Sequence, residues 1–368
     1  MKGYGKKLRG VNLGGWLVLE RWMTPSLFAG LTGEDETAWC RAMASEAEPR
    51  LKQHWQQFII EADFAWLAGL GINAVRIPVG HWLFGEGYPY HPSYGSQAYP
   101  YAKGGEYYLE QAFTWAERHG LSIVLDLHAA PGCQNGFDNG GIKDVCEWHL
   151  QAAYQQFSLD VLEQLAERYQ HSPALVGIEV LNEPRWDIPT EILQAYTEQA
   201  YQRIRRYCPA EKVAVVFHDG FRDFQAFAGL SQNPAHHNLL FDIHRYQCFA
   251  QDDLDTDIYG HISKSVNNWQ EEANQLISKA GCNTIVGEWS LGLHPTMLEL
   301  WAKQPSDLSA TSMDDFQQNL AYRAYAAAQL LSFEKYSGWF FWSYKTETMP
   351  QWSFCDCVAR GWLPNRFN

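Results

Sequence analysis

Two carboxylic acids of this chain each stand beside a short apolar run. Glu183 follows the apolar run 180–181, with one Asn between them, and Glu288 directly follows the run 285–287. Cleavage of a glycosidic bond requires one carboxyl group that protonates the departing oxygen and a second that attacks the anomeric carbon or activates water. Acids beside Pro or Gly after a strand are common in loops, so either one alone would indicate little. The pair predicts glycoside hydrolysis if the fold brings both acids to one pocket.

Six further apolar runs end in, or lead into, residues that can contact a ligand. They cover residues 8–13, 72–78, 123–128, 213–218, 239–244 and 338–342. With the runs that precede the two acids, this makes eight predicted strands. Segments with helical periodicity lie between them, at 51–70, 107–119, 150–169, 190–207, 258–280 and 314–334. Strands that alternate with helices indicate a parallel sheet, in which the carboxyl ends of all strands meet on one face.

We therefore predict the α/β class and, within it, a single (β/α)8 TIM barrel that occupies residues 1–368 as one catalytic domain, with long loops at the C-terminal face of the strands. An open dinucleotide-binding sheet is less favoured, because the segment after the first run lacks the Gly spacing that a pyrophosphate requires. A chain of 368 residues that is 46% hydrophobic can bury a large core.

Charge and aromatic content narrow the partners. The net charge of -14 argues against binding to nucleic acid or to an anionic membrane surface. Aromatic residues make up 15% of the chain, with 16 Trp, and aromatic faces suit the C–H faces of sugar rings, although most Trp residues pack in cores. No apolar stretch is long enough to span a membrane. A sugar is the expected partner, and nothing in the sequence indicates an oligomeric state.

The cysteines and the N-terminus suggest a compartment. The eight Cys residues are scattered through a large domain, so free thiols are expected. The pair Cys355 and Cys357 has no accompanying cluster of His or Cys, which makes a metal site improbable, and we expect neither metal nor cofactor. Residues 2–9 are polar and basic without the apolar stretch of a signal peptide. We expect a cytoplasmic protein, or a secreted one whose signal peptide is absent.

Motifs spread in order along the chain resemble those of glycoside hydrolase family 5, and within it the exo-β-1,3-glucanase type. The matching segments are RGVNLGGWLVLE at 9–20, TPSLF at 24–28, NAVRIP at 73–78, DLHAAPG at 126–132, QNGFDN at 134–139, LNEP at 181–184, HD at 218–219, HRYQ at 244–247, GEWS at 287–290 and FWSYKTE at 341–347. The Asn-Glu-Pro element is shared by many retaining glycosidases, whereas QNGFDN and the Trp-x-x-Lys-Thr-Glu element are more particular.

The resemblance implies that Glu183 is the general acid and base, and that Glu288 is the nucleophile of a retaining, double-displacement reaction. A retaining pair predicts carboxyl groups roughly 5 to 5.5 Å apart. Arg76 and the hydroxyl of Tyr246 would keep Glu288 ionised by charge and hydrogen bonding. Glu183 must hold its proton near neutral pH, so we expect its carboxylate to be the less stabilised of the two.

The resemblance also implies a set of substrate-binding residues. Asn182 would bind the 2-hydroxyl of the sugar, where the contact strengthens in the transition state. Trp342 would form the floor of the first subsite. The remaining expected contacts are His128 and His244 beside the acids, Glu20, Asp138 and Asn139 at a closed pocket end that selects a terminal glucose, and Phe137 and Phe249 flanking the next subsite. His218 would support the site without touching sugar.

Two segments depart from the family pattern. The segment 81–105 is longer than the corresponding loop of the family, and the segment between 289 and 314 is shorter. Loops over a barrel mouth tune specificity, so the aglycone preference stays open. An exo-β-1,3-glucanase would release glucose from the non-reducing ends of β-1,3-glucan. A β-glucosidase that acts on sterol, lipid or small-alcohol glucosides is the alternative. A sugar-binding protein without catalysis is disfavoured because both acids are present.

Overall fold

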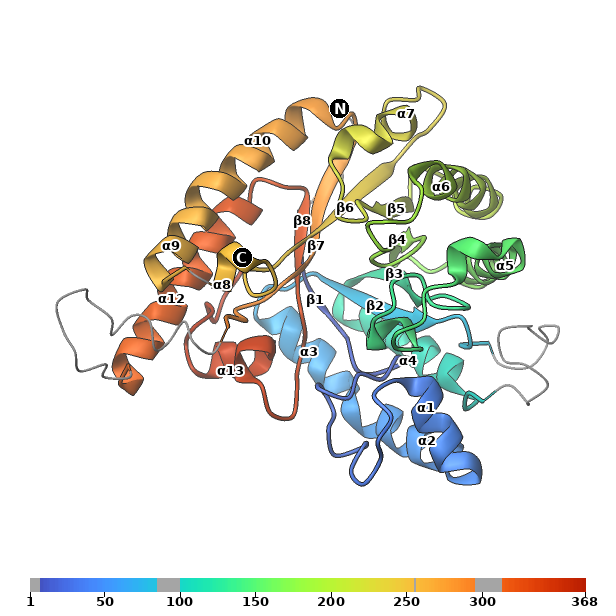
Figure 1. Cartoon of the computed structure of the whole chain (residues 1–368), viewed down its shortest axis with the longest axis horizontal. Coiled ribbons are helices and arrows are strands. Elements are labelled where there is room, and N and C mark those ends of the chain that lie inside the picture. The colour runs from blue at the N-terminus through green and yellow to red at the C-terminus, as the bar shows by residue number, and fades with distance from the viewer. Residues whose placement is uncertain (1–6, 85–99, 255, 295–312) are drawn as a thin grey trace.

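Eight parallel strands pair in chain order and close into a barrel, β1 joining β8 (Figure 1). The computed structural model describes residues 7–84, 100–254, 256–294 and 313–368. The strands are β1 (Leu8–Asn12), β2 (Ala74–Gly80), β3 (Ser122–Ala129), β4 (Leu175–Glu179), β5 (Ala214–His218), β6 (Leu239–Arg245), β7 (Asn283–Trp289) and β8 (Gly338–Phe341). The architecture is the predicted (β/α)8 TIM barrel.

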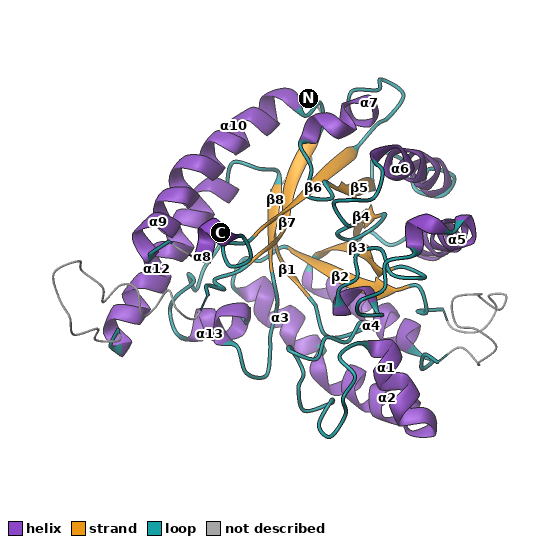
Figure 2. Ribbon diagram, viewed as in Figure 1, coloured by secondary structure: helices purple, strands orange, loops and turns teal. Residues whose placement is uncertain are grey.

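Helices lie around the outside of the strands (Figure 2). They are α1 (Glu36–Met43), α2 (Ala47–Phe58), α3 (Glu61–Gly69), α4 (Gly105–His119), α5 (Ala152–Tyr169), α6 (Thr190–Ile204), α7 (Ala228–Ser231), α8 (Gln251–Leu254), α9 (Ile258–Ser263), α10 (Trp269–Lys279), α12 (Asp315–Phe333) and α13 (Phe354–Ala359). A π-helical stretch, Lys264–Asn268, joins α9 to α10. The helices predicted at 51–70 and 258–280 are therefore each divided.

Two strand boundaries differ from the prediction in a way that concerns the site. β4 ends at Glu179, so the run 180–181 belongs to the loop after it rather than to the strand. β7 extends to Trp289, so Glu288 lies within its strand instead of after it. Glu183 thus approaches the barrel mouth from a loop, whereas Glu288 is held by the sheet.

The interior of the barrel is divided into an apolar and a polar part. Inward-facing side chains near the strand starts form a separate apolar cluster of Leu8, Ala74, Val124, Ala214, Val216, Leu240, Ile285 and Phe340. Nearer the carboxyl ends the buried side chains are charged or amide-bearing, and they include Asn12, Arg76, Asp126, Glu179 and Asp242. Buried charges are rare unless they are paired, so this upper part is where function is to be sought.

Several sequence predictions concern what surrounds the barrel. All eight cysteines are free thiols, as expected. None of the helices in the described ranges has the length and apolar character needed to cross a lipid bilayer. The departures predicted at 81–105 and between 289 and 314 lie largely outside the described residues and stay predictions.

Candidate active site

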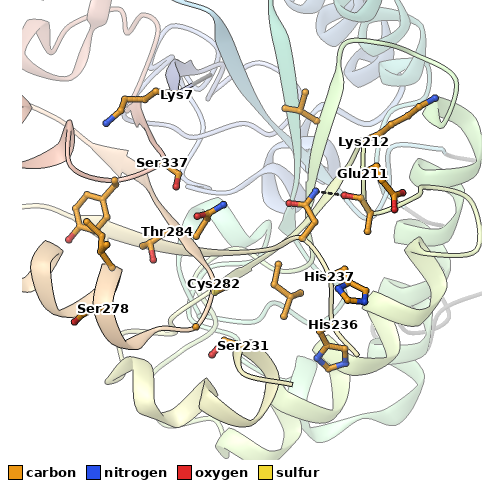
Figure 3. Close-up of a pocket in the computed structure, with 18 of the residues that line it drawn as sticks. Lys7, Glu211, Lys212, Ser231, His236, His237, Ser278, Cys282, Thr284 and Ser337 are labelled. Carbon is orange, nitrogen blue, oxygen red and sulfur yellow. Dashed lines mark hydrogen bonds between the residues drawn. The ribbon is translucent and has the colours of Figure 1, made fainter. Parts of the chain in front are cut away.

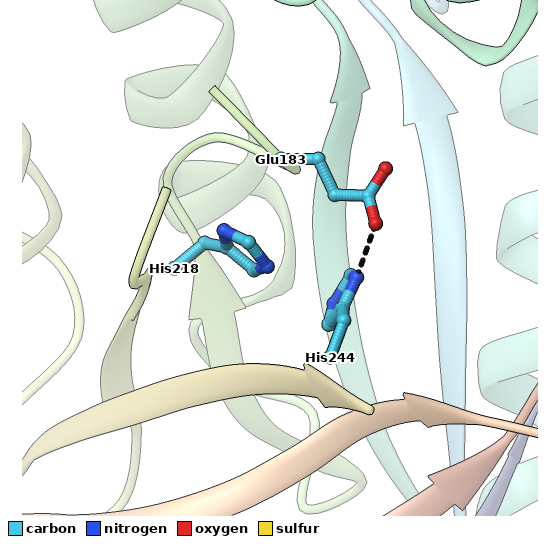
Figure 4. Close-up of side chains that lie close together, drawn as sticks. All are labelled: Glu183, His218 and His244. Carbon is cyan, nitrogen blue, oxygen red and sulfur yellow. Dashed lines mark hydrogen bonds and ion pairs between the residues drawn. The ribbon is translucent and has the colours of Figure 1, made fainter. Parts of the chain in front are cut away.

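The acids at 183 and 288 reach the same histidine. Nδ1 of His244 lies 2.7 Å from Oε1 of Glu183 and 3.4 Å from Oε2 of Glu288, and Figure 4 shows the first of these contacts. The two carboxylate oxygens are therefore no farther apart than the sum of these distances. Contact with one shared histidine nitrogen brings both carboxyl groups to the same site, as two acids that act on one anomeric centre require.

Strand register explains why Glu288 and His244 are neighbours. His244 on β6 and Glu288 on β7 are register partners, and the β6–β7 ladder shifts immediately before His244. The β7–β8 ladder is also irregular, between Val286 and Trp289. Irregularities of this kind bend a strand and redirect its side chains near active sites. Gly287 permits this arrangement, because a Cβ there would meet the carboxylate oxygens of Asp242.

Glu183 has an unusual backbone conformation. Its φ is 42°, in the left-handed region that residues other than Gly rarely adopt. Two backbone hydrogen bonds fix the flanking loop. The backbone N–H of Asn182 donates to the carbonyl of Leu127 at 3.0 Å, and the backbone N–H of Val180 donates to the carbonyl of Val216 at 3.0 Å. Such conformations persist only where the surroundings over-determine them, and they cluster at functional sites.

Glu288 is held by two donors. A guanidinium nitrogen of Arg76 lies 3.0 Å from Oε1, and the hydroxyl of Tyr246 donates to Oε2 at 2.8 Å. Both oxygens of Glu288 are therefore fixed in direction, and the side chain is buried. A carboxylate that must attack one carbon atom benefits from such positioning.

Arg76 lies at the centre of the polar layer and is fully buried. Its donors reach side chains on several neighbouring strands and loops: Glu179 at 2.7 Å, Asn182 at 2.8 Å, Asn12 and Glu288 at 3.0 Å each, and Asp126 at 3.1 Å. A planar guanidinium can satisfy this many oxygens at once, which an ammonium cannot. Arg76 thus positions Glu288 directly, and its expected contact with substrate stays a prediction.

The expected sugar-binding residues lie around the same network. The side-chain oxygen of Asn182 accepts from Arg76, which leaves its buried amide nitrogen without a partner. His128 contacts Asp126 through Nδ1 at 2.6 Å, so its buried Nε2 is also unpartnered. The ring of His128 stacks on that of Trp342, with centroids 5.3 Å apart and an interplanar angle of 6°. These two nitrogens and the Trp342 ring suit the hydroxyls and the face of a sugar.

Three polar residues were expected at a closed pocket end. Glu20 is buried, accepts from Nε1 of Trp22 at 2.8 Å through one oxygen and leaves the other oxygen unpartnered. Burial raises the pKa of Glu20 well above its usual value, and the negative charge of Asp138 raises it further. Asn139 accepts from Asn135 at 3.0 Å. The charge of Asp138 thus acts on Glu20, and the role of the three residues at a closed pocket end stays a prediction.

Phe137 and Phe249 are the aromatic pair expected to flank the next subsite, and this role stays a prediction. Phe249 is 73% exposed and packs its ring near those of Tyr246, at 5.6 Å, and Trp352, at 6.3 Å. Phe137 is half-buried and immediately precedes a short 3-10 helix. The sequence did not single out Trp352 as part of this aromatic wall.

The two acids differ in pKa in the direction opposite to the one expected. Burial raises the pKa of Glu183, but the hydrogen bond and charge of His244 outweigh it, so that the pKa is lowered overall. The pKa of Glu288 is raised by burial and by the charge of Glu183, although His244 and Arg76 lower it. His244 is nearer to Glu183 than to Glu288, which is the physical reason. Burial lowers the pKa of His244, but the acids around it raise it well above 6.5.

Sequence reasoning missed three acids in this layer. Asp126, Glu179 and Asp242 all lie inside strands and are fully buried. The signal was available, because each interrupts an otherwise apolar strand run. Asp242 accepts from the amide of Gly287 at 2.6 Å and lies 3.6 Å from Nε2 of His244. These acids balance the charges of Arg76 and His244.

A cavity in the described part of the chain lies at the opposite end of the barrel. It has a volume of about 1190 Å³ and contains none of the expected site residues. Residues at or just before the strand starts line it, among them Lys7, Leu239, Asn283 and Ser337 (Figure 3). Active sites in this fold lie at the carboxyl ends of the strands. The polar layer around Arg76 is therefore the better candidate.

The family model for cellulase, glycosyl hydrolase family 5, matches residues 40–347, which include both acids and the whole layer from β2 to β8. The chain belongs to glycosyl hydrolase family 5. It is therefore a glycoside hydrolase.

Relatives within the family are similar over nearly their full length. Glucan 1,3-beta-glucosidase 2 of Wickerhamomyces anomalus is 34% identical, with 98% of this chain and 88% of the relative covered. Glucan 1,3-beta-glucosidase 1 of Schizosaccharomyces pombe is 32% identical, with 98% and 89% covered. The crystal structure of a rutinosidase from Aspergillus niger aligns with a TM-score of 0.78 at 22% identity, covering 97% of this chain and 98% of that one. This last similarity shows the fold alone.

Proposed function

We propose that this hydrolase is a retaining exo-β-1,3-glucanase that releases glucose from the non-reducing ends of β-1,3-glucan or its oligosaccharides. The observation that carries the proposal is the position of His244, which contacts both Glu183 and Glu288. Two acids that share one histidine lie near enough for one anomeric centre. The substrate class is supported by relatives named glucan 1,3-beta-glucosidase.

In the first step Glu288 attacks the anomeric carbon while Glu183 gives a proton to the departing oxygen. Nδ1 of His244 and Oε1 of Glu183 share a hydrogen bond of 2.7 Å, along which a proton passes between them. Transfer along that hydrogen bond loads Glu183. The departing oxygen becomes more basic as its bond breaks, which draws the proton onward.

In the second step water replaces the aglycone, and Glu183 takes a proton from it as the bond to Glu288 breaks. The product keeps the β configuration because two inversions occur at the same carbon. Arg76 and Tyr246 donate hydrogen bonds to the Glu288 carboxylate that is regenerated. Asn182 and His128 each offer a buried nitrogen without a protein partner to the hydroxyls of the sugar.

Exo action is supported by Glu20. A buried acid with a raised pKa keeps its proton and can donate to a hydroxyl, while its interaction with Asp138 places a second acceptor nearby. A site that hydrogen-bonds particular hydroxyls rejects sugars in which those hydroxyls are substituted or inverted. Glu20 and Asp138 would thus hold the terminal glucose and prevent the chain from extending past it.

Time-resolved product analysis tests the proposal. The protein is incubated with β-1,3-, β-1,4- and β-1,6-linked glucose oligomers, and the released sugars and their anomers are followed by chromatography and proton NMR. We expect β-glucose as the first product, with the β-1,3 oligomers turned over fastest. Initial release of a disaccharide would exclude the exo mode, and release of α-glucose would exclude retention.

One observation favours a second candidate, a β-glucosidase that acts on apolar glucosides. Trp352 contacts both Tyr246, at 5.3 Å between centroids, and Trp22, at 5.4 Å, so an aromatic wall extends from the acids to the exposed Phe249. Such a wall can hold an apolar aglycone as well as a sugar ring. Comparing kcat/KM for laminaribiose and for an octyl glucoside decides between them.

A further inference from the structure

The hydrogen bonds of His218 fix which ring nitrogen carries its proton. His218 is the last residue of β5, and its Nδ1 accepts the backbone N–H of Gly220 at 2.8 Å. A nitrogen that accepts cannot carry a hydrogen, so the neutral ring has its hydrogen on Nε2. Protonation of both nitrogens would set two donors against each other at Gly220. His218 is thus fixed as an Nε2–H donor.

The donor nitrogen Nε2 is buried and has no hydrogen-bond partner in the protein. The rings of His218 and His244 meet edge to face, with centroids 4.3 Å apart. Figure 4 shows the His218 ring directed toward the space beside Glu183 and His244. A buried donor without an acceptor is costly, so its presence here indicates an acceptor that the protein itself does not supply.

A metal ion is a weaker interpretation of the same three residues. Glu183, His218 and His244 each place one potential ligand atom within 4.8 Å of the other two. Metal-binding histidines, however, almost always donate their second ring N–H to an oxygen. Nδ1 of His218 faces an N–H donor instead, so Nε2 cannot release its hydrogen to bind a cation without leaving an anionic ring. The tautomer favours a hydrogen-bond donor.

We propose that His218 is a further positioning residue, whose Nε2–H and the carboxylate of Glu183 together bind one water molecule. One ring nitrogen of His218 lies within 4.8 Å of a carboxylate oxygen of Glu183. Because Nδ1 already accepts from Gly220, Nε2 is the nitrogen that can share a water molecule with Glu183. Two hydrogen bonds of about 2.8 Å that meet at a tetrahedral oxygen span roughly 4.6 Å. One oxygen atom therefore fits between them.

The consequence is electrostatic and acts through Glu183. As Glu183 gives its proton to the departing oxygen, negative charge forms on its carboxylate. The Nε2–H of His218 has a fixed position and stabilises that charge through the one water molecule between it and Glu183. Burial lowers the pKa of His218, and the nearby charges of His244, Arg76, Arg245 and Arg222 lower it further, while Asp219 lies 3.4 Å from Nδ1. The donor is thus neutral and cannot itself compete for the proton. This role rests on the proposed acid function of Glu183.

Two matched variants test the role. In His218→Gln the amide nitrogen lies near the position of Nε2, and in His218→Asn it lies near that of Nδ1, so only the first keeps the donor. We expect His218→Asn to lower kcat/KM about tenfold on a methyl or phenyl glucoside, which needs acid assistance, and less than threefold on a dinitrophenyl glucoside, which does not. His218→Gln should stay within threefold of the original on both. Equal losses on both substrates, or equal losses in both variants, would overturn the proposal.

A second measurement needs neither variants nor substrate. Nitrogen-15 NMR of histidine-labelled protein distinguishes a ring nitrogen that carries hydrogen from one that does not. For His218 we expect Nε2 protonated, Nδ1 unprotonated and no change between pH 5 and pH 8. A cationic ring or an Nδ1–H tautomer would contradict the assignment even if the variants were unstable. Because this measurement is independent of turnover, it separates failure here from failure of the proposed hydrolysis.

Discussion

The two ends of the barrel use polar residues in opposite ways. At the N-terminal end a cavity is lined by two ion-paired side chains, Lys7 with Glu334 and His236 with Glu198, and by two buried hydroxyls without a partner, those of Thr284 and Tyr336. At the C-terminal end buried charges surround Arg76. Several buried atoms there have no partner, including nitrogens of His128, Asn182 and His218. Unpartnered nitrogens around a cluster of buried charges, rather than cavity volume, identify the place where a ligand completes the structure.

The comparison also separates two purposes of ion pairs. Arg9 at the N-terminal end binds both oxygens of Glu334, at 2.9 and 3.0 Å, and both side chains remain about one third exposed. Arg76 is fully buried and is shared among several acids. An exposed pair contributes little because water and salt screen it, whereas removing one partner of a buried pair leaves charges that cannot be solvated. Variants at the two ends can therefore test whether burial makes the ion pairs of Arg9 and Arg76 differ in their contribution to stability.

The largest effect is expected at the nucleophile. Glu288→Gly should lower kcat/KM for an aryl glucoside at least about 10⁴-fold, because the covalent step is lost. Added azide should enter the vacated space, restore turnover of an activated aryl glucoside and give the α-glycosyl azide, identified by NMR. The control is Glu211→Gly at the N-terminal cavity, which should stay within twofold. A β-azide product would exclude Glu288 as nucleophile.

The acid and base should show a smaller effect that depends on the substrate. Glu183→Ala should lower kcat/KM about 10²- to 10⁴-fold on glucosides with poor leaving groups, which is the range of general acid catalysis. On dinitrophenyl glucoside the loss in this parameter should be far smaller, because the leaving group needs no proton. Steady-state kinetics on a series of aryl glucosides measures this slope. A loss independent of the leaving group would assign Glu183 another role.

Much of this site was predictable because it depends on strand ends. In a barrel the residues that follow or complete each strand meet on one face, so Arg76, His128, His244 and Trp342 could be assigned to one mouth without coordinates. The family motifs supplied the polar residues of the loops. The closed barrel followed from the count of strands and the helices between them.

What the sequence could not give depends on distances within the mouth. Which acid His244 approaches more closely decides the order of their pKa values, and a difference of less than 1 Å separates the two contacts. The positive φ of Glu183 arises because β4 ends early and the loop is fixed by other strands. The strand acids Asp126, Glu179 and Asp242 were overlooked because strand prediction rests on apolar neighbours, which these positions have.

Arg76→Met should separate stability from chemistry. Because Glu179 and Asp126 would lose their buried partner, we expect the free energy of unfolding to fall by about 3–5 kcal/mol, as measured by urea denaturation monitored by Trp fluorescence. The loss should shrink at lower pH, where the acids can be protonated. A change below 1 kcal/mol would mean that the polar layer is solvated, contrary to its burial.

Asp219, which follows β5 at the mouth, should make stability depend on pH. Burial raises its pKa from 3.8 to about 6, although Arg245 lowers it. The native state then holds the Asp219 proton more tightly than the unfolded chain does. The contribution of this proton to stability is therefore complete below about pH 3.8 and is lost as pH rises through about 6. Asp219→Asn should remove up to about 3 kcal/mol of this dependence. Asp187→Asn, at an exposed position, is the control, and an unchanged pH profile for Asp219→Asn would refute the assignment.

Arg9→Met should have the smallest effect and completes the contrast. Its guanidinium binds both oxygens of Glu334 and also the carbonyl of Phe367 at 2.7 Å, yet its partial exposure limits the expected loss to about 0–1 kcal/mol. Added salt should reduce that loss further, since exposed charges are screened, and kcat/KM should not change. If urea denaturation instead gave a loss as large as that of Arg76→Met, burial would not be what distinguishes the two ends. In that case the number of hydrogen bonds per guanidinium would be the better explanation.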